Sequence, residues 1–245
     1  MDVTFIGSGD AFGSGGRFNT CFLVAGAETR FLIDCGASTP VALKSAGIDL
    51  NAIDGVVLTH LHGDHFGGLP FLLLDAQLMS KRIRPFFIWG PEGFPQRLRD
   101  LREALFPGSS SVALKFAIET AELAAGRRHR GAGFAVTPYP AVHSAGGNPC
   151  FSLRFECDGK VVTYSGDTAW SDALAQAAQG SDLFICECSS YEKPVKGHLA
   201  YLPLKQNLPA LGAKRVILTH MNPDMLAKLA EVEIETARDG LTLTV

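Results

Sequence analysis

The sequence predicts a protein of the α/β class (α+β in some schemes), in which two mixed β-sheets pack together and carry helices outside. Each half of the chain begins with short hairpins and continues with strand–helix units, which predicts antiparallel and parallel strands in one sheet. Each half also places a Leu-Thr-His sequence at the end of a strand-like run, at 58–60 and 218–220. No linker interrupts the pattern, so residues 1–245 are expected to form a single domain.

Strands in the first part of the chain are predicted where short β-branched or aromatic runs are bounded by turn residues. These runs lie at 3–6, 20–25, 30–34, 56–59, 86–89 and near 112–118. Residues 26–28 predict a hairpin between the second and third run. Helices are predicted at 38–47, 66–80 and 92–105; the first starts at Ser38, has a proline in its first turn and ends at Gly47.

The second part of the chain repeats this alternation. Strands are predicted at 134–139, 150–157, 160–165, 183–188, 215–219 and 241–245. Helices are predicted at about 170–179, at 200–211 and near 223–230. Asp158-Gly159 is a strong two-residue turn between the strands at 150–157 and 160–165. The basic cluster at 127–130 is expected in a solvated loop.

Composition sets limits on partners and location. With 47% hydrophobic and 19% charged residues the chain can bury a sizeable core, and a net charge of −3 gives no support for bulk electrostatic binding of nucleic acid. The amino terminus lacks the features of a signal peptide, and no apolar run approaches the length of a membrane span. The six cysteines include no C-x-x-C pair and are expected to be reduced, buried thiols. A cytoplasmic protein without a membrane partner is therefore expected.

Four potential metal ligands follow the strand-like run at 56–59: His60, His62, Asp64 and His65. Imidazole and carboxylate together suit zinc, manganese or iron. His60 and His62 are two residues apart and point the same way if strand geometry continues. Asp64 and His65 are adjacent, so they diverge and could serve a second metal. The spacing therefore predicts a metal centre rather than a solvated loop.

The sequence from Leu58 to His65 resembles the H-x-H-x-D-H signature of the metallo-β-lactamase fold superfamily, which forms a four-layer αββα sandwich of two mixed sheets. The resemblance implies a two-metal site of a hydrolase, completed by three residues that each follow a strand-like run: His143, Asp167 and His220. It assigns His60, His62 and His143 to the first metal. Asp64, His65 and His220 go to the second.

Asp167 would bridge the two ions by the same resemblance. The expected cofactors are two divalent ions, zinc first, with manganese or iron as alternatives. Such a pair polarises the substrate and supplies a bridging hydroxide as nucleophile. Asp34, at the end of the strand 30–34, is expected to hydrogen-bond a metal-bound imidazole.

Two further segments resemble the tRNase Z branch of this superfamily and related phosphodiesterases. Gly197-His198-Leu199 is similar to the glycine–histidine element of that branch, and Glu187 ends a strand where the branch has an orienting glutamate. The resemblance implies that His198 contacts the phosphate and protonates the leaving oxygen, while Glu187 orients it. Asp64 is counted with these catalytic residues as well as with the ligands. The glycine-rich loop at 7–16 is expected beside the metals.

The expected function is therefore a two-metal phosphodiesterase acting on a small or short nucleotide-like substrate. tRNase Z carries a long tRNA-gripping arm between the positions of His143 and Asp167, whereas only residues 144–166 lie between them here, so long tRNA is not the expected partner. Ring-opening cyclic phosphate diesterases share the armless plan, although their cysteine-rich zinc site is missing. A lactone or thioester hydrolase of the same fold is the alternative, and a metal-dependent binding or oxidoreductase module is a third.

The apolar helix predicted at 66–80 has two interpretations. It is either a helix of the core or, through its exposed portion, a surface for a homodimer. The core interpretation is preferred.

Overall fold

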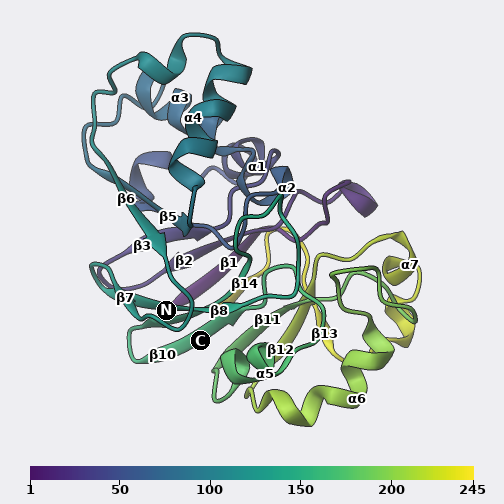
Figure 1. Ribbon diagram of the computed structural model, residues 1–245. Coiled ribbons are helices and arrows are strands. Elements are labelled where there is room, and N and C mark those ends of the chain that lie inside the picture. Colours follow the sequence, from purple (N-terminus) through teal and green to yellow (C-terminus); the bar gives the residue numbers. More distant parts are fainter.

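The computed structural model describes all residues 1–245 and contains two mixed seven-stranded sheets packed face to face (Figure 1). The first sheet has the order β14-β1-β2-β3-β4-β5-β6, with bounds β1 Asp2–Gly7, β2 Cys21–Ala25, β3 Arg30–Ile33, β4 Gly55–Val57, β5 Phe86–Pro91, β6 Ile118–Leu123 and β14 Thr242–Thr244. The second has the order β13-β12-β11-β10-β9-β8-β7, with bounds β7 His129–Arg130, β8 Phe134–Pro140, β9 Phe151–Cys157, β10 Lys160–Tyr164, β11 Leu183–Glu187, β12 Val216–Thr219 and β13 Glu235–Thr236.

Helices form the two outer layers. The first layer, on the side of the first sheet, consists of α1 Thr39–Ser45, α2 Gly63–Phe66, α3 Leu69–Leu78 and α4 Phe94–Leu105. The second layer consists of α5 Asp172–Ala178, α6 Tyr201–Leu211 and α7 Pro223–Leu226. Four single turns of 3₁₀ helix lie in the connections: η1 Ser14–Gly16, η2 Leu50–Ala52, η3 Ser109–Ser111 and η4 Leu229–Glu231. In Figure 1, α3 and α4 lie at the opposite end of the molecule from α5 and α6.

The core is divided into three apolar clusters because successive side chains of a strand point to opposite faces. Phe22 and Val24 of β2 join the cluster between the two sheets, whereas Leu23 joins the cluster beneath the first helical layer. On the other side, Ile185 of β11 faces the first sheet and Phe184 packs under the second helical layer. Burial on both faces explains why these strands are continuous apolar runs in the sequence. The predicted four-layer αββα arrangement of two mixed sheets is confirmed.

The strand directions bring distant parts of the chain to one edge of the sandwich. Strands β10, β11 and β12 are parallel neighbours, and β8 runs in the same direction because β9 is antiparallel to both β8 and β10. The first sheet ends at the same edge, since the backbone N–H of Phe151 donates to the carbonyl of Thr59 at 3.1 Å. The carboxyl ends of parallel strands are where open α/β sheets place their ligands.

Most predicted elements are present with shifted ends, but one strand and two helices differ and two short strands are added. The helix expected near 223–230 is the single turn α7 followed by η4. The strand expected near 112–118 is wrong: residues 118–123 form β6, which pairs in parallel with β5 from Phe86 opposite Ile118. Phe116 and Leu114 instead pack against the first helical cluster without sheet pairing. The two-residue strands β7 and β13 were not predicted, because such short edge pairings leave no hydrophobic pattern.

The single helix expected at 66–80 is divided into α2 and α3. The chain between them passes close to the turn after β3, where a Cβ on Gly68 would lie 2.2 Å from the carbonyl oxygen of Gly36. On α3, Leu69, Leu72, Leu73 and Ala76 are buried, which fits the core interpretation. Phe71, Leu78 and Met79 are exposed, so the homodimer remains a prediction. No helix of the structure has the length and apolarity needed to cross a membrane.

Gly36 allows α2 to sit against the turn after β3, and its replacement tests this contact. A Cβ on Gly36 would lie 2.0 Å from the carbonyl oxygen of Asp64 and 2.5 Å from Cβ of Asn19. We expect Gly36→Ala to lower the free energy of unfolding of the metal-free protein by about 1–3 kcal/mol or more, as overpacking does. Denaturant titration measures this. Gly63→Ala is the matched control, since a Cβ there meets nothing within 4 Å; equal effects of both changes would contradict the steric argument.

Candidate metal centre

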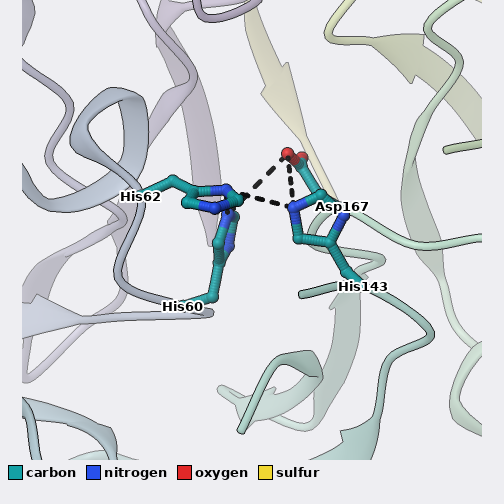
Figure 2. Close-up of side chains that lie close together, drawn as sticks. All are labelled: His60, His62, His143 and Asp167. Carbon is teal, nitrogen blue, oxygen red and sulfur yellow. Dashed lines mark hydrogen bonds and ion pairs between the residues drawn. The ribbon is translucent and has the colours of Figure 1, made fainter. Parts of the chain in front are cut away.

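The first group of potential ligands consists of His60, His62, His143 and Asp167 (Figure 2). Nδ1 of His62 lies 3.1 Å from Nε2 of His60 and 3.1 Å from Nε2 of His143. Oδ2 of Asp167 lies 3.8 Å from Nε2 of both His60 and His143. Three imidazole nitrogens and one carboxylate oxygen therefore converge on one point, which is the donor set that zinc prefers.

The second group consists of Asp64, His65, Asp167 and His220. Nε2 of His65 lies 3.2 Å from Oδ2 of Asp64 and 3.3 Å from Oδ1 of Asp167. Nε2 of His220 lies 3.3 Å and 3.5 Å from the same two oxygens. The two oxygens of Asp167 thus face different groups, Oδ2 the first and Oδ1 the second. Both Asp64 and His65 belong to α2, whose short turn brings them together rather than apart.

Hydrogen bonding within the protein leaves part of this cluster unsatisfied. Nε2 of His65 and Oδ1 of Asp167 are buried and have no hydrogen-bond partner. Buried polar atoms in folded proteins almost always have a partner. Two unpartnered ligand atoms facing each other at 3.3 Å are what a bound cation would satisfy, so the residues fit divalent metal ions.

Neighbouring groups turn three of the imidazoles so that Nε2 faces the cluster. His65 donates from Nδ1 to Asp34 at 2.7 Å, and His143 donates from Nδ1 to the carbonyl of Gly197 at 2.9 Å. The hydroxyl of Thr59 donates to Asp34 at 2.7 Å and so accepts from Nδ1 of His60 at 3.0 Å. Such partners fix the tautomer of a metal-binding histidine. Asp34 lies where the sequence predicted it and acts on two of the rings.

Backbone conformation is unusual at two of these positions. Asp34 and His220 adopt positive φ angles of 62° and 59°, in the left-handed region that non-glycine residues seldom occupy. Strain of this kind clusters at functional sites, where the surrounding structure holds it in place. At His220, the backbone is held by a hydrogen bond from its N–H to the carbonyl of Ser8 at 3.1 Å.

The histidines of the two groups differ in the direction in which their pKa values are shifted. Burial, then the neighbouring His65, lowers the pKa of His60 well below its usual range, and burial also lowers the pKa of His143. Burial alone would lower the pKa of His65, but the carboxylates of Asp167, Asp64 and Asp34 outweigh it and raise this pKa. Asp167 and Asp64 likewise overcome burial at His220 and raise its pKa to about 9. In the metal-free protein, burial thus favours neutral rings at His60 and His143 of the first group, whereas the carboxylates favour protonated rings at His65 and His220 of the second.

A third group consists of Glu187, His198 and His220. His198 donates from Nδ1 to Oε1 of Glu187 at 3.0 Å, and the same oxygen accepts from the backbone N–H of Thr168 at 2.8 Å. The ring of His198 lies edge-on to His143 at 4.9 Å between centroids and stacks on His220 at 5.6 Å. The pair inferred from the resemblance is thus assembled, and His198 lies between a histidine of each metal-binding group.

Two other predictions concern the surroundings of the metal-binding groups. Gly9 of the glycine-rich loop forms an isolated β-bridge with Met221, the residue after His220. This agrees with the expected place of the loop beside the metals. The six cysteines are free and buried, as expected, and none belongs to a potential metal-binding group. The sequence did not single out the roles of Thr168 and of the Gly197 carbonyl. Both contacts use backbone atoms, which the residue type does not reveal. The sequence offered only one hint, that Thr168 is next to Asp167 and Gly197 is next to His198.

Comparison with known proteins identifies the family. Residues 1–238 match the family model described as anti-Pycsar protein Apyc1. The chain belongs to this family. A ribonuclease Z from Agathobacter rectalis is 27% identical over 92% of this chain and 89% of the relative. The structure of human tRNase Z, short form, has a TM-score of 0.81 and 25% identity over 100% of this chain and 99% of that chain.

A second solved structure has the same overall fold. The metallo-β-lactamase fold protein YhfI from Bacillus subtilis has a TM-score of 0.81 and 21% identity over 99% of this chain and 98% of that chain. Together these likenesses confirm the predicted metallo-β-lactamase superfamily and its tRNase Z-like branch.

The protonation of the second group makes a prediction about metal binding. Metal must displace protons from His65 and His220, so we expect affinity at the second group to rise between pH 7 and 9. The rise should be about tenfold per pH unit for each displaced proton. The metal affinity of the first group should change little above pH 7, because burial lowers the pKa values of His60 and His143. Zinc titration against a chromophoric chelator measures both equivalents; two equivalents with the same flat profile over this range would contradict the assignment of protons.

Proposed function

We propose that this metal-dependent phosphodiester hydrolase acts on small or short nucleotide-like phosphodiesters and uses His198 as its general acid. The observation that carries the proposal is the position of His198, paired with Glu187 and lying between the two metal-binding groups. A group there can reach an oxygen that departs from a phosphate held over both groups. Ribonuclease Z, the name of the relatives with similar sequences, supports the reaction class.

The proposed ligands follow the two groups. His60, His62 and His143 would hold the first ion, Asp64, His65 and His220 the second, and Asp167 both. Two bound ions supply Lewis acidity and an activated water. A donor set rich in imidazole, with carboxylates, favours zinc over manganese or iron. Asp64 contributes as a ligand, and Asp34 contributes by orienting His60 and His65.

Glu187 prepares His198 for proton donation. Its Oε1 accepts from Nδ1 of His198, which leaves Nε2 as the ring atom free to face a substrate. Burial alone would lower the pKa of His198, but the hydrogen bond and charge of Glu187 outweigh it and raise this pKa. The raised pKa favours the protonated ring, which is the form that a general acid needs.

The short segment between His143 and Asp167 supports a small substrate. Strands β9 and β10, joined by the turn at Asp158 and Gly159, take up most of it, which leaves no room for a tRNA-gripping arm. The net charge of −3 also provides no bulk attraction for a long polyanion. We therefore propose that a cyclic mononucleotide or a dinucleotide is hydrolysed in preference to a precursor tRNA, within one domain of residues 1–245.

A substrate panel tests the reaction class. We expect zinc-loaded protein to hydrolyse bis-p-nitrophenyl phosphate, to lose the activity on chelation, and to regain it when zinc is restored. A chromogenic lactone, a thioester and a β-lactam serve as carboxyl substrates in the same assay. Turnover of these substrates alone would reject the phosphodiesterase and establish the lactone or thioester hydrolase in its place.

The leaving group tests the role of His198. A sugar alkoxide needs a proton to depart, whereas p-nitrophenolate does not. We therefore expect His198→Ala to slow the hydrolysis of a nucleotide diester by about 10²–10⁴-fold and that of an activated aryl diester far less. Steady-state kinetics measure both rates, and metal content should be unchanged. His129→Ala is the control, since His129 belongs to none of the three groups. Equal losses on both substrates would mean that His198 binds phosphate rather than donating a proton.

A further inference from the structure

The segment that carries His198 is a compact loop closed at its base. The backbone N–H of Ser189 donates to the carbonyl of Leu199 at 3.0 Å, and Ser190 bridges to Ala200. Inside the loop, the N–H of His198 donates to the carbonyl of Val195 at 2.9 Å. Residues 192–196 are exposed, so few apolar contacts hold the loop down. Loops of this kind open locally at low cost unless a specific contact holds them.

Two specific contacts hold this loop: His198 donates to Glu187, and Gly197 contacts the first metal-binding group. The carbonyl of Gly197 accepts the Nδ1 hydrogen of His143 at 2.9 Å. Since a carbonyl can only accept, Nδ1 of His143 carries the hydrogen and a neutral ring presents an unprotonated Nε2 toward Asp167. The hydrogen bond therefore joins the loop to the tautomer of His143 that can bind a metal.

Only glycine fits at this position. The φ angle of Gly197 is +78°, in the region that residues with a side chain avoid. An added Cβ would also lie 2.9 Å from Nδ1 of His143, closer than such contacts are found. A larger residue would thus push away the very imidazole that the carbonyl holds. His198, the next residue, would move with the loop.

We propose that Gly197 is a positioning residue that links the acid to the first metal, so that an ion bound by His143 orders the loop of residues 190–198 and sets His198 between the two groups. The naming of His198 as the acid rests on the proposed function. The linkage itself rests on the Gly197–His143 contact. An ion that fixes the His143 ring strengthens this hydrogen bond, and the bond in turn holds the loop in its closed form.

Hydrogen–deuterium exchange of the loop tests the linkage without using activity. Peptides that cover residues 190–198 are followed in metal-free protein and in protein loaded with zinc alone. We expect zinc to slow exchange in the wild type by about tenfold or more, the scale on which partners of metal-binding histidines act. In Gly197→Ala this zinc-dependent slowing should be lost, and affinity for one of the two zinc equivalents should fall by about 10–100-fold.

Gly126→Ala is the matched control. Gly126 has a φ angle of +73° and nothing within 4 Å of an added Cβ, so the change brings the same backbone strain without the clash. It should keep the zinc-dependent slowing and both zinc affinities. Thermal melts of the two variants confirm that each is folded.

The outcomes separate the linkage from the reaction class. Exchange of the loop that ignores zinc in the wild type, or zinc-dependent slowing that survives Gly197→Ala, overturns the linkage. If both exchange results are as expected and the wild type still hydrolyses no phosphodiester, the linkage holds and the proposed function fails. If diesters are hydrolysed, Gly197→Ala should reproduce the leaving-group signature of His198→Ala, with a loss of about 10–100-fold on a nucleotide diester and a much smaller loss on an aryl diester.

Discussion

The structure depends on one buried carboxylate that faces four imidazoles. Asp167 is almost fully enclosed, and its two oxygens lie 3.3–3.8 Å from nitrogens of His60, His65, His143 and His220. A buried anion is costly unless cations surround it. The two whose pKa values are raised, His65 and His220, come from α2 and from the end of β12, so the charge of Asp167 is balanced in the metal-free protein only when the two halves of the sandwich are assembled.

Packing is what allows these groups to approach one another. Parallel strands deliver Asp167, Glu187 and His220 to one edge, and the hydrogen bond between Phe151 and Thr59 brings the other sheet to the same edge. Asp34 then fixes the direction of two rings through three hydrogen bonds of 2.7 Å. These hydrogen bonds hold the strained backbone at Asp34, and the hydrogen bond from the backbone N–H of His220 to Ser8 holds that at His220. Rigid strands thus supply position, and short polar contacts supply orientation.

The same arrangement keeps the proposed general acid apart from the candidate metal ligands while leaving it in contact with them. His198 is outside both metal-binding groups, but its ring contacts one histidine of each. Glu187 orients the ring through Nδ1, and Gly197 ties the loop to His143. In the proposed reaction, His198 is placed by contacts with the candidate ligands His143 and His220 rather than by binding a metal itself.

Much of this molecule follows from its amino-acid sequence. The apolar runs predicted the layered α/β class, because strands buried on both faces have no polar side. The H-x-H-x-D-H spacing identified His60, His62, Asp64 and His65, because ligands so close in sequence must be close in space. The resemblance added His143, Asp167, His220, His198 and Glu187, which the structure brings together.

Other features were decided only by tertiary structure. The position of β6 depends on its register with β5, and the two-residue strands β7 and β13 exist only because a neighbour pairs with them. The resemblance assigned Asp64 and His65 to one metal, but only the turn of α2 shows how two adjacent residues can face the same point. Thr168 acts through its backbone N–H and Gly197 through its backbone carbonyl. Nearly every residue has these two groups, so the residue type does not reveal such roles. By itself the sequence determined which side chains could bind metal; the tertiary structure decided their directions and partners, because backbone hydrogen bonds and close approach depend on the folded geometry rather than on residue type.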